Sequence, residues 1–179
     1  RKKVRSSYKK SRKKDQRRSP KYYTKEDIFI SRMASILMVP RHRIISIFSQ
    51  RAKTTIRLNG LKGTPKETYK LLKARGYILT PIPWANNVYF VENRDKAEIS
   101  QIEEYRNGLF YIQDLSSILA TLILNPQEKE NILDMCAAPG SKTTHIADIT
   151  NNKAKILAND SEVSRTNSLR NVVEQFGAS

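Results

Sequence analysis

The spacing of apolar residues predicts two short helices near the start of the chain. The first begins in a capping box formed by Thr24 and Asp27 and ends before Pro40, which cannot continue a helix. The second covers residues 44–48. The apolar positions at helical spacing are Phe29, Met33, Ile36, Leu37, Ile44, Ile47 and Phe48. We expect these side chains to form a buried core face.

The middle of the chain has the pattern of a compact α+β unit. The predicted strands are 54–58, 77–80, 88–91 and 109–112. Between the first two strands, Thr64 and Glu67 form the capping box of a helix that ends at Gly76. Asp114 caps a further helix over 115–124, which the following Asn-Pro pair ends.

The last third of the chain alternates strands with helices. The predicted elements are a buried strand over 131–135, a helix over 142–150, a strand over 155–160 and a helix from Ser161 to Gly177. A β-α-β-α order of this kind is the opening half of a doubly wound parallel sheet. The sequence therefore predicts an α/β fold in which half of such a sheet follows a small α+β unit.

Most of the formal charge of +16 lies in the first 21 residues, where 12 are Lys or Arg and one is acidic. This tail has a net charge of +11, which leaves +5 for the rest of the chain. We expect it to be disordered, because it has too few apolar residues to offset its ordering entropy. Nucleic acid is the expected polyanionic partner. Alternatively, the basic run is a solvated segment or, in a eukaryote, a nuclear signal.

Composition argues against several other kinds of site. The chain has no apolar run long enough for a membrane span or a signal-peptide core, so no membrane partner is expected. Its single cysteine, Cys136, excludes an internal disulfide and a cysteine-based zinc site. His42 and His145 have no partner at metal-ligand spacing, so we expect surface or structural roles and no metal. The aromatic residues that either stack on bases or simply pack are Tyr22, Tyr23 and Trp84.

A loop of small residues after the first predicted parallel strand is the candidate cofactor site. Its members are Cys136, Ala137, Ala138, Pro139, Gly140, Ser141 and Lys142. Small side chains let a nucleotide-type ligand approach the backbone at this turn. Asp160 ends the second strand, 20 residues after Gly140, where a carboxylate can accept hydrogen bonds from ribose hydroxyls. Asp134 faces the same crevice from the end of the first strand.

Other ligands suit this loop poorly. A phosphate-binding Walker A loop needs adjacent Gly and Lys, but Ser141 separates Gly140 from Lys142, and Met135 stands where an earlier Gly is required. The G-x-G-x-x-G pattern of nicotinamide sites is absent. Taken by spacing alone, an ordinary strand-to-helix turn remains an alternative.

The segment from Leu133 to Thr143 resembles the cofactor motif of the Nop/Sun-type (RsmB/RsmF-like) RNA cytosine-5 methyltransferases. Residues 108–117 are similar to the stretch that precedes the catalytic domain in this family. Residues 56–59 and 80–84 resemble the bacterial branch that modifies small-subunit ribosomal RNA. The likeness extends from about Arg51 to the end, whereas the helices before it are less typical.

This resemblance implies a Rossmann-like class I methyltransferase sheet preceded by a small α+β RNA-binding domain. S-adenosyl-L-methionine would be held by residues 136–142, with Asp160 on its ribose. The expected regions are a disordered basic tail over 1–22, a helical and α+β RNA-binding region over 23–125, and a truncated methyltransferase domain over 126–179. By the same resemblance, RNA, and specifically ribosomal RNA, would be the partner of a monomeric, cytoplasmic protein (nuclear or nucleolar in a eukaryote).

The family's chemistry requires a residue type that the chain has only once. In the family, a cysteine thiolate adds to C6 of cytosine so that C5 can attack a methyl group. Its two cysteines stand in Pro-Cys and Thr-Cys motifs after the second strand, so we expect the nucleophile C-terminal to Ser179 and none in this chain. We expect Cys136 to pack behind the cofactor. Alternatives are an RNA-binding module with a vestigial methyltransferase half, or the same enzyme class acting on transfer RNA.

Overall fold

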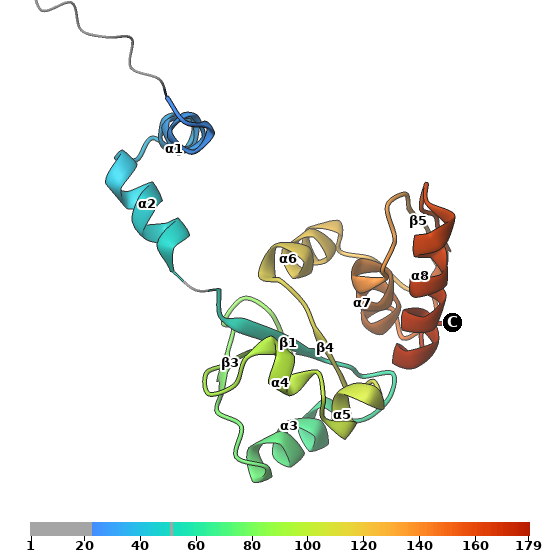
Figure 1. Cartoon of the computed structure of the whole chain (residues 1–179). Helices are drawn as coiled ribbons and strands as arrows, with labels where there is room; N and C mark the ends of the chain where they lie inside the picture. Colours follow the sequence, from blue (N-terminus) through green and yellow to red (C-terminus); the bar gives the residue numbers. More distant parts are fainter. Residues whose placement is uncertain (1–22, 51) are drawn as a thin grey trace, which may run out of the picture. The chain divides into compact units, whose positions relative to one another are not determined.

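The computed structural model describes residues 23–50 and 52–179 and divides the chain into two compact units, 1–51 and 52–179 (Figure 1). The predicted tail over 1–22, including Tyr22, lies outside the described residues. The division between the units follows residue 51. The two starting helices therefore form a unit separate from the α+β region with which the sequence grouped them.

The first unit is a pair of helices that buries little apolar surface. Its helices are α1 (Lys25–Ile36) and α2 (Arg41–Ser49). The predicted capping box is confirmed, since the backbone N–H of Asp27 donates to Oγ1 of Thr24 at 3.1 Å. The predicted core face is largely wrong, because Ile30 and Ile44 are the only buried residues of the two helices. The exposed members of that face are Phe29, Ile36, Leu37, Ile47 and Phe48.

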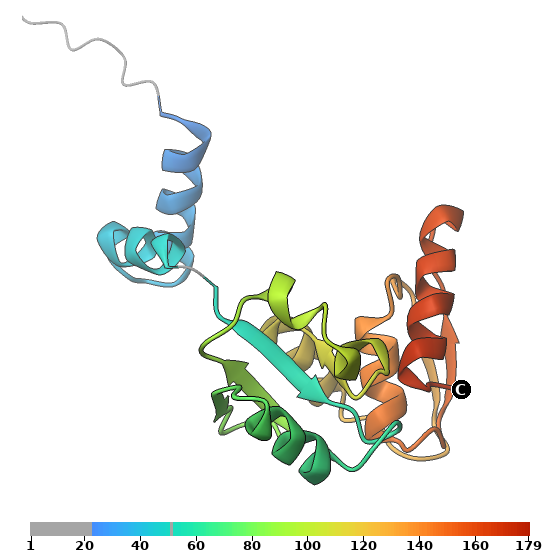
Figure 2. The same cartoon turned by 60° about the horizontal axis from the view of Figure 1, so that its bottom comes forward.

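The second unit begins with an antiparallel sheet in the order β2-β3-β1-β4 (Figure 2). Its strands are β1 (Thr54–Leu58), β2 (Leu79–Pro81), β3 (Val88–Val91) and β4 (Phe110–Ile112). Its helices are α3 (Pro65–Ala74), α4 (Lys96–Ile99), α5 (Glu103–Arg106) and α6 (Leu115–Leu124). The sequence missed α4 and α5, and its strand over 77–80 begins two residues before β2 begins and ends one residue before β2 ends. Thr64 and Asp114 occupy the expected capping positions, but neither side chain makes the capping hydrogen bond.

Alternate residues of this sheet pack on opposite faces, as the period of a β-strand requires. On one face, Ile56 and Leu58 of β1 join a core with Leu72 of α3. On the other face, Val88 of β3 packs against Ile118 of α6. Because helices cover both faces, β1 is buried along nearly its whole length, including Arg57, which stands between its two core residues.

The end of the chain has the predicted β-α-β-α order. Its elements are β5 (Asn131–Asp134), α7 (Ser141–Ile149), β6 (Lys155–Ala158) and α8 (Val163–Phe176). The two strands are parallel, with Asp134 paired to Ala158. The prediction of a buried first strand is wrong, because Leu133 of β5 is 57% exposed, and Leu157 of β6 is 67% exposed as well. Because these two leucines are paired neighbours, they leave an apolar face of the two-stranded sheet exposed.

The two parts of this unit meet at Gly108, which has a φ of +73°. A Cβ atom here would lie 2.2 Å from the carbonyl oxygen of Gln175 in α8. Nδ2 of Asn59 links the same two segments, because it donates to the carbonyl oxygens of Gly108 and Phe176 at 2.8 and 2.9 Å. Only glycine fits this close approach of two backbone segments.

We predict that Gly108→Ala lowers the free energy of unfolding by on the order of 3 kcal/mol, through left-handed strain and overpacking together. Gly76→Ala is the matched control, because Gly76 also has a positive φ (+83°) but open space around its Cβ position. Its expected loss is only about 1 kcal/mol. Denaturant unfolding of both variants measures the difference. Equal losses would show that the contact with α8 contributes nothing.

Candidate functional site

The predicted cofactor loop connects the end of β5 with the start of α7. Within it, Ala137, Ala138 and Gly140 are buried, whereas Cys136 and Pro139 are exposed. The two alanines pack against Leu169 of α8. Small residues are needed for this packing too, since a Cβ on Gly140 would lie 2.9 Å from Cγ1 of Val172. The loop is therefore shaped by the helix behind it.

The structure brings Asp160 onto the same rim of the parallel strands as this loop. Its Oδ2 accepts a hydrogen bond from the backbone N–H of Ala138 at 3.1 Å. Its Oδ1 accepts from the N–H of Glu162 at 3.3 Å and pairs with Nη1 of Arg165 at the same distance. The Asp160 side chain is only 2% exposed. The expected proximity of loop and carboxylate is thus present, with the carboxylate held under Arg165.

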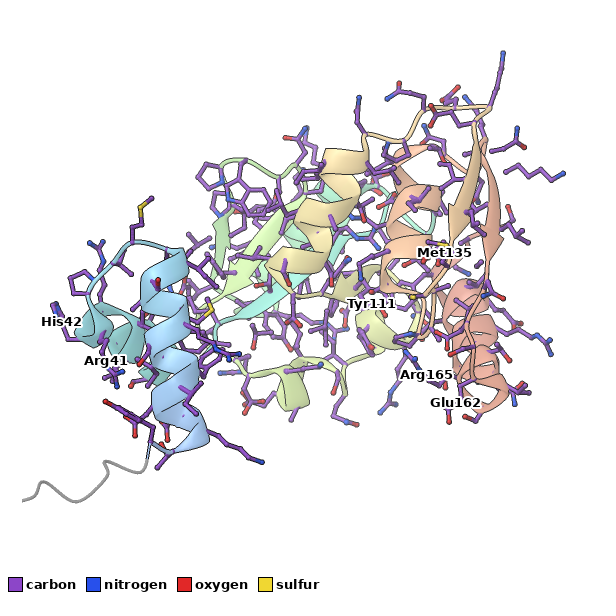
Figure 3. All side chains as sticks on the ribbon, turned by 90° about the horizontal axis from the view of Figure 1, so that it is seen from above. Arg41, His42, Tyr111, Met135, Glu162 and Arg165 are labelled. Atoms are coloured by element: carbon purple, nitrogen blue, oxygen red, sulfur yellow. The ribbon has the colours of Figure 1, made fainter. Side chains whose placement is uncertain are left out.

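Arg165 is a residue of this site that the sequence interpretation missed. Its Nη2 donates to the carbonyl oxygen of Ala138 at 2.6 Å, so one guanidinium joins the loop to Asp160. Figure 3 shows Arg165 beside Glu162 at the start of α8. The sequence did contain an indication of this role. A positive charge in the first turn of a helix is unfavourable next to the helix dipole, so an arginine there suggests a nearby carboxylate or carbonyl partner.

Asp134 holds the other end of the loop. Its Oδ2 accepts from Oγ1 of Thr143 at 2.8 Å, and its Oδ1 accepts from the N–H of Cys136 at 3.3 Å. The side chain of Cys136 is exposed in the described chain. The expectation that it packs behind the bound cofactor stays a prediction. Ser141 and Lys142 begin α7, as predicted, and both are partly buried.

The chemistry of this rim suits a ligand that carries a ribose. A carboxylate oxygen can accept more than one hydrogen bond, and Oδ2 of Asp160 accepts only one within the described residues. The Arg165 side chain that pairs with Asp160 is itself 50% exposed. The residues that would hold the ligand are then Asp160 and the loop over 136–142.

A buried ion pair fixes the antiparallel sheet to α7, away from the rim. Arg57 of β1 is 1% exposed, and its Nη1 contacts Oδ2 of Asp148 at 2.5 Å. Its Nε donates to Oε1 of Gln113 at 3.1 Å, and the N–H of Gly60 donates to Oδ1 of Asp148 at 2.9 Å. Burial lowers the pKa of Arg57 and raises that of Asp148, while each charge opposes the shift of the other.

His145, one turn before Asp148 on α7, is buried, and its Nδ1 has no hydrogen-bond partner among residues 23–50 and 52–179. The expected surface or structural role is therefore structural. Burial, reinforced by the positive charge of Arg57, lowers the pKa of His145 to about 3 from an ordinary value of 6.5. The imidazole is neutral in the folded chain at neutral pH.

This shift predicts a loss of stability in acid. The unfolded chain binds the proton near pH 6.5 and the folded chain only near pH 3, so stability falls as the pH drops below 6.5. Between pH 7.5 and 5 the loss from His145 is about 2 kcal/mol. Denaturant unfolding at both pH values should show this loss in the native sequence relative to His145→Leu, in which other titrating groups are unchanged. Parallel pH profiles for the two proteins would contradict it.

Two kinds of site are absent from the described parts of the chain. Across residues 23–50 and 52–179, no helix is long and apolar enough to cross a membrane. Over the same ranges, no three His, Cys, Asp or Glu side chains are grouped to hold a metal ion.

The fold and the rim define the opening part of a Rossmann-like methyltransferase preceded by an N-terminal domain. A methyltransferase homolog protein from Pyrococcus horikoshii has a TM-score of 0.77 and 28% identity, with 88% of this chain and 50% of that chain covered. NSun6 from the same organism, solved with SFG, has a TM-score of 0.71 over 84% of this chain and 62% of that chain. Its identity is 19%, so it shows the fold alone.

The chain belongs to the 16S rRNA methyltransferase RsmB/F family, as the Nop/Sun-type resemblance led us to expect. The family model described as the N-terminal domain of 16S rRNA methyltransferase RsmF matches residues 26–115, and the one described as 16S rRNA methyltransferase RsmB/F matches residues 121–179.

Curated relatives agree with the family models. Ribosomal RNA small subunit methyltransferase F of Shewanella loihica is 36% identical over 140 residues, which cover 75% of this chain and 29% of the relative. The protein of that name from Escherichia coli O81 is 38% identical over 131 residues, which cover 71% of this chain and 27% of the relative. The chain thus spans less than a third of the length of these two relatives.

Proposed function

We propose that this chain supplies the cofactor loop and an RNA-holding domain for S-adenosyl-L-methionine-dependent methylation of cytosine C5 in small-subunit ribosomal RNA. The observation that carries the proposal is the hydrogen bond from the Ala138 N–H to Asp160, which joins the loop and the carboxylate on one rim. Membership in a methyltransferase family supports the choice of a methyl-donor cofactor.

In this proposal, the chain binds and orients the cofactor. Residues 136–142 hold its methionine and ribose portion, and Asp160 accepts hydrogen bonds from the ribose hydroxyls. The cofactor, when bound, supplies an electrophilic methyl group. Cys136 is the single thiol of the 179 residues and stands in the cofactor loop, so the nucleophilic cysteine is not among these residues.

The RNA-holding role is assigned to the antiparallel sheet region and the basic tail. A net charge of +16 favours a polyanion, and the relatives are named for ribosomal RNA rather than transfer RNA. Those relatives are bacterial, which supports a cytoplasmic site of action over a nuclear one. The competing proposal, an RNA-binding module with a vestigial methyltransferase half, predicts that no cofactor binds.

Equilibrium dialysis with methyl-labelled S-adenosyl-L-methionine, followed by incubation with 16S rRNA, separates these possibilities. We expect saturable binding that excess unlabelled cofactor displaces, and no transfer of label to RNA. Absence of binding would favour the vestigial module. Transfer of label by the 179-residue chain would contradict the assignment of the nucleophile outside it.

A further inference from the structure

A polar cavity of about 400 Å³ lies at the end of α7 remote from the cofactor loop. Four segments line it: the end of β1, the β2–β3 loop over 83–87, the end of α6 through Pro126, and the C-terminal half of α7. None of the loop residues 136–142 contributes to it. Its volume falls in the range of small-ligand sites.

Side chains with unused hydrogen-bonding groups gather in this cavity. The carboxamides of Asn86, Asn87 and Asn125 make no hydrogen bond within the described part of the chain. Nδ1 of His145, a side chain 4% exposed, is a further polar atom without a partner among the described residues. Trp84 adds a half-exposed aromatic ring. The cavity thus offers several donors and acceptors beside one flat apolar surface.

The cavity carries no free charge. Arg57 and Asp148 both line it, but each is neutralised by the other. His145 is neutral at physiological pH, because burial lowers its pKa to about 3. A phosphate group would therefore find no uncompensated cation here. A neutral, planar ligand with donors and acceptors on its edge matches the lining, since it can stack on Trp84 and pair with the carboxamides.

We propose that this cavity binds one unpaired nucleobase of the RNA. The proposal rests on the proposed function for the identity of the polymer. The cavity and the cofactor loop lie at opposite ends of α7, whose nine residues span about 12 Å. The bound base is therefore a flanking nucleotide, distinct from the cytosine that receives the methyl group. Such a contact would fix the register of the RNA on the protein.

Trp84 reports directly on this cavity because it is the only tryptophan of the chain. The 179-residue chain is titrated with single-stranded pentaribonucleotides of A, C, G and U and, in a second arm, with the free nucleosides. We expect saturable quenching of Trp84 fluorescence by at least one oligonucleotide. Anisotropy of the same oligonucleotides, labelled with a dye, measures RNA binding independently of Trp84.

Asn125→Gly removes one carboxamide while keeping a residue that tolerates the left-handed backbone found there (φ +50°). We expect it to weaken the affinity of the quenching oligonucleotide about fivefold, the loss of one hydrogen bond. Asn151→Gly is the matched control, with the same chemical change and the same φ outside the cavity, and should leave the affinity unchanged.

The other possible results of these titrations contradict either the cavity proposal or the proposed function. If oligonucleotides bind by anisotropy while Trp84 fluorescence stays constant, or if both glycine variants behave alike, the cavity proposal is wrong and the proposed function stands. Quenching by nucleosides alone would mean that the ligand is not a base within RNA. If anisotropy shows no RNA binding, the proposed function itself fails.

Discussion

Replacing Asp160 with alanine should weaken binding of S-adenosyl-L-methionine at least about 100-fold. Hydrogen bonds from two ribose hydroxyls to a carboxylate contribute on the order of 3 kcal/mol together, and each 1.4 kcal/mol is a factor of ten. The variant also leaves the N–H of Ala138 without its acceptor, which loosens the loop. Isothermal titration calorimetry of the native sequence and the variant measures the change.

Two further variants distinguish the ribose contact from a general charge effect. Glu162→Ala removes the same charge from an exposed neighbour and should leave cofactor affinity unchanged. Asp160→Asn keeps an acceptor for Ala138 but loses the negative charge, so an intermediate loss of about tenfold is expected. RNA affinity should remain nearly intact in all three. Native cofactor affinity in Asp160→Ala would remove Asp160 from the site.

Replacing Arg57 with methionine should lower the free energy of unfolding by about 3–5 kcal/mol. The variant removes the cation that faces Asp148 and leaves a largely buried carboxylate uncompensated, which is the costly way to break such a pair. Urea unfolding followed by circular dichroism measures the loss. The cofactor loop is not part of this ion pair, so the effect is on stability first.

The double variant Arg57→Met with Asp148→Leu tests this explanation. Replacing both charges by apolar groups of similar size is often close to neutral, so most of the lost stability should return. Recovery will be incomplete, because the N–H of Gly60 loses its acceptor on Asp148. A double variant as unstable as Arg57→Met alone would show that the uncompensated charge is not the cause.

The spacing of apolar residues along the sequence predicted those parts of the fold that depend on local strand and helix patterns. The β-α-β-α order follows from alternating strand and helix periods, and the 20-residue offset from Gly140 to Asp160 predicted that they share a rim. Both expectations agree with the structure. Cofactor binding by these residues stays a prediction, since geometry alone does not test it.

Features set by distant contacts were not predictable from spacing. The pair Arg57–Asp148 joins residues 91 positions apart, and nothing in the alternation of β1 shows that both of its faces are covered. The prediction that α1 and α2 bury a shared apolar face was wrong for a related reason. Helical spacing identifies an apolar stripe, but it does not show whether anything covers that stripe: Phe29 and Phe48 contact each other, with ring centroids 5.1 Å apart, and both stay about half exposed.

Contacts between the antiparallel sheet and the helices α7 and α8 connect the domain proposed to hold RNA with the cofactor loop. Arg57 near the end of β1 contacts α7, and Asn59, directly after β1, contacts α8. The domain proposed to hold RNA is therefore fixed to the helix that follows the cofactor loop. Substrate and cofactor would then be held at a set separation, which catalysis by positioning requires.

Nuclear magnetic resonance on the isotope-labelled chain is the most direct test of the central claim that the small-residue loop and Asp160 together hold the methyl donor. On titration with S-adenosyl-L-methionine, the backbone amide signals of Ala137, Ala138, Gly140 and Asp160 should shift and saturate together, with small changes in the antiparallel sheet. Saturable shifts confined to residues outside 134–142 and 160–165, or no shifts at all, would contradict the account.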